Sequence, residues 1–303
     1  MLKEKHIYNV AIIGAGNISS GFDDNNSDRV LTHAHAIKNN AKFNLLGFYD
    51  INDEKLELAI KKWNCKKLSL DDVYKADVVV IATPDEYHKF YIDKLIDTDV
   101  KFIIAEKPLV SNLVELREIK DKIINKNIIL NYSRRFIDEF KHLNYGKLLK
   151  GNAYYGKGFI HNGSHMLDLI EKLGFKIEKI EVNNIVNDYI EKTIDAKLLL
   201  DNGIINLNAI DSTKVTIFEL DLLFENKRVI IKNSGMNIEY YNVIESDIFK
   251  GYYNYVLDKS VNIDYSNCMI NLYEKVYHCL ENNIKHSENL DLIEKMFMVL
   301  END

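Results

Sequence analysis

The sequence predicts an α/β protein in two parts: a doubly wound parallel sheet, then a smaller α+β domain with a large, mainly antiparallel, open sheet. Two observations lead to this prediction. Up to about residue 130, short β-branched runs alternate with segments whose apolar residues have helical spacing. After about residue 146, strand-like stretches follow one another, separated by turn signals such as Asp201-Asn202-Gly203. The expected domains are residues 1–130 and 131–303.

In the first part, five runs of β-branched and aromatic residues predict strands, and three amphipathic stretches between them predict helices. The expected strands are 8–13, 43–50, 78–83, 102–106 and 128–132. The expected helices are 53–63, 87–96 and 112–125. This alternation is typical of parallel strands joined by crossover helices.

In the second part, seven stretches predict strands: 147–155, 176–186, 193–200, 203–209, 215–224, 227–232 and 236–241. Three stretches predict helices: 163–173, 266–282 and 289–300. Because neither a repeat nor a Pro/Gly/Ser-rich linker interrupts the chain, we expect the domains to pack closely.

Composition excludes several classes of protein. The chain has 303 residues, 47% of them hydrophobic, and a net charge of −7 without a basic stripe, which argues against binding to nucleic acid. Its three cysteines lack Cys-x-x-Cys spacing, so we expect neither disulfides nor a metal site. No apolar run is long enough to span a membrane, and the first strand begins too early for a signal peptide. We therefore expect a soluble, cytoplasmic protein.

The only two prolines each follow a predicted buried strand, as Ala82-Thr83-Pro84 and Glu106-Lys107-Pro108. Proline has no backbone N–H and keeps the preceding residue extended, so it fits where a strand ends. Ligands bind at the carboxyl edge of parallel sheets. The sequence therefore predicts that Lys107 lies at a ligand site.

A glycine-rich turn follows the first strand and indicates a dinucleotide site of the Rossmann type. Gly14 permits a tight turn, and Gly16 lets a pyrophosphate approach the helix N-terminus that begins with Asn17 and Ile18. Asp50, at the end of the second strand, is the expected partner of the ribose hydroxyls and would favour NAD over NADP. The alternative is that Asp50 only caps the following helix.

The ordered set of motifs resembles the Gfo/Idh/MocA family of sugar oxidoreductases. The set comprises the glycine turn, Ala82-Thr83-Pro84 with His88, Glu106-Lys107-Pro108 and the run Tyr132-Ser133-Arg134-Arg135-Phe136. The resemblance covers essentially the whole chain. It implies a Rossmann domain that binds NAD(P) and a C-terminal domain that binds a sugar and forms a dimer or tetramer.

The resemblance also implies roles for particular residues. Thr83, Pro84 and His88 would line the cofactor, and Glu106 and Lys107 would lie by the nicotinamide. Lys107 would in addition contact the reacting oxygen of the substrate. The Lys107-Pro108 peptide bond is expected to be cis.

A second motif, His161-Asn162-Gly163-Ser164-His165-Met166-Leu167-Asp168, resembles the family pattern Asp-x-Gly-x-His-x-x-Asp. The resemblance makes His165 the proton-transfer residue and Asp168 its companion, while His161 replaces the first aspartate. At i and i+3, His165 and Asp168 share a helix face. A helix N-terminus at Gly163-Ser164 would disfavour protonated His165, which suits a general base. The alternative for His165 is a hydrogen-bonded core residue.

Other candidates have two interpretations each. His161 and Asn162 would contact substrate or only shape a loop. Arg135, like Arg134, would bind a substrate phosphate or pair with a carboxylate. Of His33 and His35, which are two residues apart, one would face the cleft and the other solvent.

These inferences predict an NAD-dependent oxidoreductase that interconverts a secondary alcohol and a ketone on a sugar. The resemblance favours a nucleotide-activated or amino sugar of surface-polysaccharide biosynthesis. A free polyol or inositol is the enzymatic alternative, and a catalytically silent NAD-binding regulator is the alternative from another class. The sequence leaves open the sugar, the carbon and the direction of the reaction.

Overall fold

The computed structural model describes residues 6–188, 191–211 and 214–301, and the chain divides into two compact units. The first unit is Met1–Phe136 with Ser266–Leu290, and the second is Ile137–Tyr265 with Asp291–Asp303. They differ from the predicted ranges 1–130 and 131–303 because a C-terminal helical segment packs in the first unit. Among the described residues, no helix combines the length and apolar character that crossing a membrane requires.

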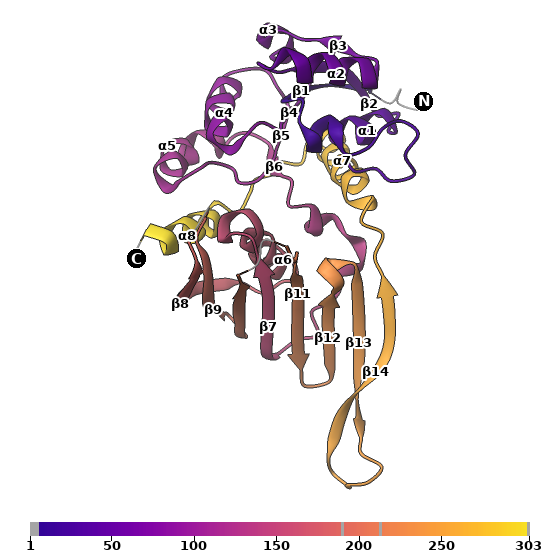
Figure 1. Cartoon of the computed structure of the whole chain (residues 1–303), viewed down its shortest axis with the longest axis vertical. Helices are drawn as coiled ribbons and strands as arrows, with labels where there is room; N and C mark the ends of the chain where they lie inside the picture. The colour runs from indigo at the N-terminus through magenta and orange to yellow at the C-terminus, as the bar shows by residue number, and fades with distance from the viewer. Residues whose placement is uncertain (1–5, 189–190, 212–213, 302–303) are drawn as a thin grey trace. The chain divides into compact units, whose positions relative to one another are not determined.

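The first unit contains a six-stranded parallel sheet in the order β3-β2-β1-β4-β5-β6 (Figure 1). Its strands are β1 (Tyr8–Ile13), β2 (Phe43–Tyr49), β3 (Lys66–Lys67), β4 (Val78–Ile81), β5 (Phe102–Ala105) and β6 (Ile128–Leu130). Every residue of β4 and β5 is buried, as expected for strands covered on both faces. The predicted doubly wound parallel sheet is therefore confirmed.

Helices on both faces complete this unit. They are α1 (His33–Lys38), α2 (Asp53–Trp63), α3 (Leu70–Val73), α4 (His88–Ile96), α5 (Leu113–Ile123) and α7 (Asn267–Glu281). Helix α7 lies beside α1 (Figure 1), and the Tyr273 hydroxyl is 3.0 Å from His33 Nδ1. This buried contact, together with the aromatic packing of Tyr273 on Phe43, explains why the segment joins the first unit.

The second unit contains an eight-stranded sheet in the order β14-β13-β12-β11-β7-β10-β9-β8. Its strands are β7 (Leu148–Gly156), β8 (Ile177–Asn187), β9 (Thr193–Leu200), β10 (Gly203–Ile210), β11 (Phe218–Phe224), β12 (Lys227–Lys232), β13 (Asn237–Glu245) and β14 (Tyr253–Asn262). Among these pairs β7 and β10 are parallel and the rest are antiparallel, which confirms the predicted mainly antiparallel sheet. Strand β14 was not predicted.

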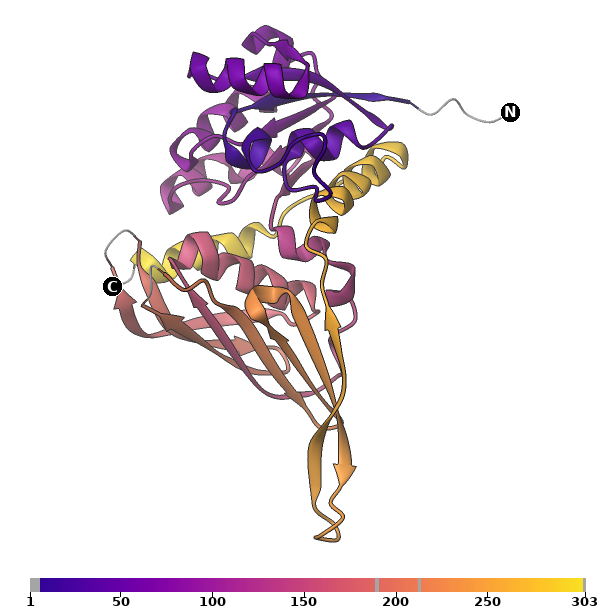
Figure 2. The same ribbon diagram turned by 45° about the vertical axis from the view of Figure 1, so that its right-hand side comes forward.

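Two helices cover one face of this sheet (Figure 2): α6 (Ser164–Lys172) and α8 (Leu290–Glu301). Alternate residues of β11 are buried, so its other face is only partly covered. The Lys295 ammonium donates to the carbonyl of Ile177 at 2.7 Å, which ties α8 to the edge strand β8. Strands β13 and β14 continue beyond their neighbours as a two-stranded ribbon (Figure 2).

Candidate functional site

The turn after β1 has the geometry that its glycines predict. Gly14 has φ +100°, and a Cβ atom there would lie 2.4 Å from the carbonyl oxygen of Ala82. A Cβ at Gly16 would meet no atom within 4 Å. Gly14 therefore permits close packing against the end of β4, whereas Gly16 faces open space that a ligand could fill.

Asp50 holds this turn in place. One carboxylate oxygen accepts a hydrogen bond from the backbone N–H of Ala15 at 2.6 Å, and the other accepts from the N–H of Asn52 at 2.8 Å. The helix cap of α2 is Asn52, whose side chain accepts from the N–H of Lys55 at 2.9 Å. The alternative interpretation of Asp50 as the cap is therefore wrong.

A cavity of about 740 Å³ lies at the carboxyl ends of β1, β2 and β4, a size typical of ligand pockets. Seven of the residues predicted to bind the cofactor line it: Gly14, Gly16, Asn17, Ile18, Asp50, Thr83 and Pro84. The sequence motifs therefore converge on one pocket, which lies wholly within the first unit.

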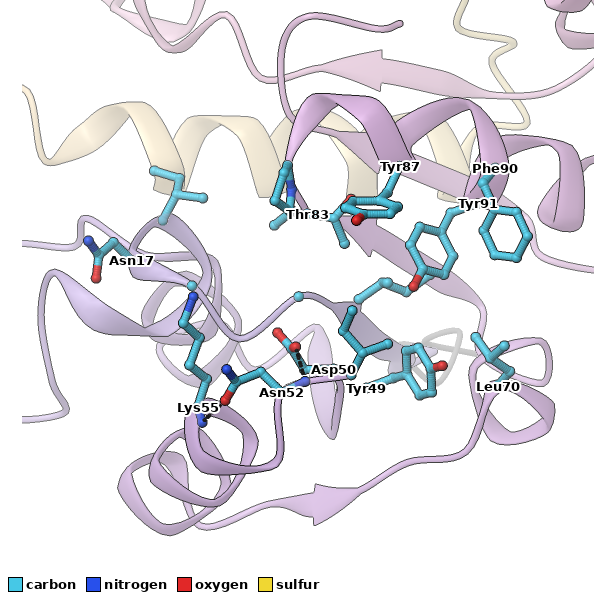
Figure 3. Close-up of a pocket in the computed structure, with 17 residues that line it drawn as sticks. Asn17, Tyr49, Asp50, Asn52, Lys55, Leu70, Thr83, Tyr87, Phe90 and Tyr91 are labelled. Carbon is cyan, nitrogen blue, oxygen red and sulfur yellow. Dashed lines mark hydrogen bonds between the residues drawn. The ribbon is translucent and has the colours of Figure 1, made fainter. Parts of the chain in front are cut away.

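The two ends of this pocket differ in character (Figure 3). Asn17, Asp50, Asn52 and Lys55 lie toward one end and supply polar groups and a positive charge. Aromatic and apolar side chains gather at the other end; they are Tyr49, Leu70, Tyr87, Phe90 and Tyr91. The polar end suits ribose and phosphate, and the aromatic end suits a flat heterocycle.

Sequence reasoning missed Lys55 and the aromatic residues. The position of Lys55 in the first helical turn after Asp50 was a usable signal for phosphate binding. Burial raises the pKa of Tyr91 to about 12, so its phenol stays protonated near neutral pH. The ring of Tyr91 packs edge-on against Phe90 at 5.1 Å and against Tyr49 at 6.4 Å.

Thr83 provides a test of whether this pocket fits a cofactor. Its hydroxyl oxygen is buried and has no hydrogen-bond partner within the described part of the chain. A buried hydroxyl without a partner is costly, and a ligand oxygen or amide in the pocket would remove that cost. Together with the open space before Gly16, this residue fits a bound dinucleotide.

His88 does not line the pocket but supports its wall from behind. The ring is fully buried, with Nδ1 2.6 Å from the carbonyl oxygen of Pro108 and Nε2 2.9 Å from that of Thr83. It thereby joins the loop after β4 to the loop after β5. The Lys107-Pro108 bond in that second loop is cis, as the resemblance implies.

Glu106, at the end of β5, belongs to a buried hydrogen-bonded network that the sequence did not reveal. Its carboxylate lies 3.0 Å from Nε2 of His33 and accepts from the Asn131 amide at 2.7 Å, while Tyr273 faces the other nitrogen of His33. Burial opposes the charge, but the hydrogen bond and the attraction of His33 lower the pKa of Glu106 overall. The nearby charge of Lys107 acts in the same direction. Glu106 is therefore an anion beside Lys107.

The expectation that one of His33 and His35 faces solvent is wrong. His33 is fully buried and His35 is 1% exposed. His35 Nδ1 lies 2.8 Å from the carboxylate of Asp23, which also accepts from the backbone N–H groups of Leu31 and Thr32. The polar insert before α1 therefore folds around a buried aspartate.

Arg135 forms a buried ion pair rather than facing a pocket. Its guanidinium donates to both carboxylate oxygens of Glu288, at 2.8 and 3.0 Å, and the two side chains are 5% and 4% exposed. Burial raises the pKa of Glu288, but the charge of Arg135 and hydrogen bonds from His286, Arg135 and Leu130 outweigh it and lower the pKa to about 2. This pairing matches the carboxylate alternative in the sequence analysis.

In the second unit, His165 and Asp168 lie on α6 and are 7% and 5% exposed. The helix starts at Ser164, but a π-helical turn, η5 (Phe159–Gly163), leads directly into it. His165 therefore lies farther from the helical N-terminus than predicted, and the argument from that terminus does not hold for it. His161 lies in the first turn instead.

His161 and Asn162 both have partners in this turn. The imidazole of His161 is 45% exposed and pairs with Glu191. The amide of Asn162 donates to the carbonyl of Lys157 at 2.6 Å, which is a structural contact of the turn itself. Glu191, which follows β8, was missed because nothing in its neighbourhood in the sequence marks it.

A parallel sheet, a glycine-rich turn, an acid at the end of β2 and a ligand-sized pocket at the same edge define a dinucleotide-binding Rossmann protein. Residues 8–132 match the family model described as "Oxidoreductase family, NAD-binding Rossmann fold". This part of the chain belongs to the Gfo/Idh/MocA oxidoreductase family, as its motifs predict.

Solved structures share the fold over nearly the full chain. UDP-N-acetylglucosamine 3-dehydrogenase GnnA from Acidithiobacillus ferrooxidans is 14% identical, with a TM-score of 0.76, over 97% of this chain and 96% of that chain. The dehydrogenase MviM from Clostridium difficile is 20% identical, with a TM-score of 0.72, over 97% and 98%. The transcriptional regulator Gal80p from Kluyveromyces lactis is 13% identical, with a TM-score of 0.75, over 98% and 89%. No curated protein sequence matches the chain.

Proposed function

We propose that the protein is an NAD-dependent oxidoreductase that interconverts a secondary alcohol and a ketone on a sugar. The observation that carries this proposal is the pocket of about 740 Å³ lined by the glycine turn and Asp50, in the unit where β5 leads into Lys107. The family of the first domain is one of NAD-binding oxidoreductases, which supports the class of reaction.

In this proposal Asp50 binds the ribose hydroxyls and Thr83 and Pro84 line the cofactor. Bound nicotinamide supplies the hydride acceptor or donor. His165 takes the proton of the substrate hydroxyl, Asp168 accompanies it on the same helix, and Lys107 stabilises the developing alkoxide with its positive charge. In the direction of ketone reduction His165 and Lys107 exchange these tasks.

The favoured substrate is a nucleotide-activated or amino sugar. The structural neighbour GnnA is named as a dehydrogenase of UDP-N-acetylglucosamine, which supports this class by likeness of fold. A free polyol or inositol is the enzymatic alternative. We also propose that the chain forms a homodimer or homotetramer.

The rival function is that of an NAD-binding regulator without catalysis. It is favoured by the likeness to Gal80p and by His161 in place of the aspartate of the family pattern. The retention of Lys107 and His165 favours the enzyme.

A substrate panel with two variants tests the proposal. We expect at least one nucleotide sugar or polyol to change NADH absorbance with the wild type. Lys107→Ala and His165→Ala should each lower turnover about 10²–10⁴-fold, because each removes a group acting on one proton transfer. The double variant should lose less than the product of the two effects.

NADH affinity, measured by fluorescence titration, should stay nearly unchanged in both variants. A His165→Ala protein with a lower melting temperature but full turnover per folded molecule would show that the residue is only structural. Tight NADH binding without turnover of any sugar would favour the regulator.

A further inference from the structure

The helical stretch that leads to His165 is held at its start by a carboxylate from a distant part of the second unit. One oxygen of Glu191 accepts from the backbone N–H groups of Ile160 and His161, the latter at 3.1 Å. The other oxygen lies 2.5 Å from Nδ1 of the His161 ring. A single side chain thus caps η5 and contacts its histidine.

Neighbouring contacts fix the position of this carboxylate. The N–H of Phe159 donates to the carbonyl of Lys192 at 2.9 Å, and the N–H of Gly158 donates to the hydroxyl of Thr193 at 3.0 Å. Residues 191–193 therefore run along the start of η5.

Gly158 leaves the space that the carboxylate occupies. It has φ +95°, and a Cβ atom there would lie 2.0 Å from Oε2 of Glu191. Any other residue would displace Glu191 as well as strain the backbone. The glycine and the carboxylate thus form one arrangement.

The contact with Glu191 sets the tautomer of His161. A carboxylate only accepts hydrogen bonds, so Nδ1 of the ring must carry a proton. In the neutral ring Nε2 is then the acceptor, and the adjacent negative charge increases its basicity. Glu191 is 18% exposed and holds the pair from within, while the ring of His161 is 45% exposed.

Capping alone does not require this pair. The oxygen that accepts from the two backbone N–H groups would cap η5 whatever residue stood at position 161. The second oxygen is occupied in orienting an exposed imidazole, four residues before His165 on a continuous helical stretch. Residues at i and i+4 face the same side of a helix.

We propose that Glu191 and His161 form a carboxylate–imidazole pair that presents Nε2 of His161 as a hydrogen-bond and proton acceptor for a substrate hydroxyl. His161 is the residue that touches substrate, and Glu191 is a positioning residue that acts through it. This inference rests on the proposed function and adds Glu191 to the residues that determine it.

Histidine ¹⁵N NMR tests the pair without any substrate. The His161 signals, assigned by their loss in His161→Gln, should show a proton on Nδ1 in the wild type and a mixture of tautomers in Glu191→Ala. Gly158→Ala, which displaces the carboxylate but keeps its charge, should reproduce that mixture. Glu191→Gln, whose amide oxygen still accepts, should retain the wild-type tautomer. The same tautomer in the wild type, Glu191→Ala and Gly158→Ala would overturn the proposal.

Kinetics then test the role. With a sugar that the wild type turns over, His161→Ala should lower kcat/KM about 10²-fold or more, as expected for a positioned proton acceptor. Glu191→Ala should lower it about tenfold, Glu191→Gln less, and the double alanine variant no further than His161→Ala, because the pair acts as a unit. Melting temperatures of all variants show whether each is folded.

The two failures are distinguishable. Full turnover by His161→Ala contradicts this inference and leaves the proposed function intact. A wild type that binds NADH but turns over no sugar contradicts the proposed function, while the NMR comparison still decides whether the pair exists.

Discussion

Asp50 supports the glycine turn and is also proposed to select the cofactor. Asp50→Ala should weaken NADH binding about tenfold, or about 1.4 kcal/mol, because it removes the acceptor for the ribose hydroxyls and loosens Ala15. NADPH binding should weaken less, since the substitution also removes the charge that repels a 2′-phosphate. Fluorescence titration of both cofactors measures the difference.

Lys55 offers a matched control at the same end of the pocket (Figure 3). Lys55→Ala removes a positive charge and should weaken NADPH binding more than NADH binding. Tighter binding of NADPH than of NADH by the wild type would show that Asp50 does not select the cofactor.

The buried pair of Arg135 and Glu288 predicts a dependence of stability on pH. The pKa of Glu288 is about 2 in the folded protein, whereas the ordinary pKa of a glutamate side chain is 4.5. A lowered pKa stabilises the fold above the unfolded value, and this stabilisation disappears as the pH falls through 4.5 toward 2. The contribution is at most about 3 kcal/mol.

Urea unfolding between pH 7 and pH 3 measures this effect. Glu288→Gln should destabilise the protein at pH 7, because Arg135 stays buried without its partner charge, and should flatten the acid part of the profile. The exposed pair of Lys67 and Asp53 provides the control, since Asp53→Asn should change stability little. An unchanged acid profile in Glu288→Gln would assign the acid sensitivity to other carboxylates.

Sequence reasoning located those site residues whose position in a motif determines their role. Gly14, Asp50 and Thr83 each follow a strand, so the edge of the sheet gathers them into one pocket. Tyr273 and Glu191 were missed because their partners, His33 and His161, lie 240 and 30 residues away along the chain. Contacts over such separations depend on packing and leave no local pattern.

At the level of elements, the turn between β1 and η1 (Asn17–Gly21) offers two glycines with different constraints. Gly14→Ala should lower the melting temperature and abolish NADH binding, because its Cβ would lie 2.4 Å from a backbone oxygen of Ala82 at a positive φ. Gly16→Ala should leave the melting temperature nearly unchanged and still weaken NADH, because its Cβ enters the open space of the pocket.

Thermal unfolding and NADH titration of the two variants separate these effects. Equal loss of stability in both would mean that Gly16 is also needed for the fold. Unaltered NADH affinity in Gly16→Ala would place the cofactor away from this turn.

Elements with clear periodicity were predicted well. The bounds of α2 and β12 agree with the sequence pattern, since an amphipathic helix and an alternating strand each have a defined period. Strand β14 was missed because almost all of its residues are exposed, so no buried face imposes an alternation on its sequence.

At the scale of the whole molecule, the change from helical to strand-rich texture predicted both sheets and their strand directions. It did not predict that α7 joins the first unit. That placement depends on the fit of Tyr273 beside His33 and Phe43, which only the folded chain brings together.

The ribbon of β13 and β14 carries a prediction about assembly. It extends beyond the sheet (Figure 2) with exposed apolar side chains at its end; they are Ile244, Ile248, Phe249, Tyr252, Tyr253, Val256 and Leu257. A two-stranded ribbon is marginally stable alone, and exposed apolar clusters mark interfaces. We therefore expect this ribbon to contact a second copy of the chain. Ile248→Asp with Phe249→Asp should shift the protein toward monomers in light scattering, whereas Leu58→Asp, at an exposed site on α2, should not. An unchanged mass for the ribbon variant at micromolar concentration would exclude this interface.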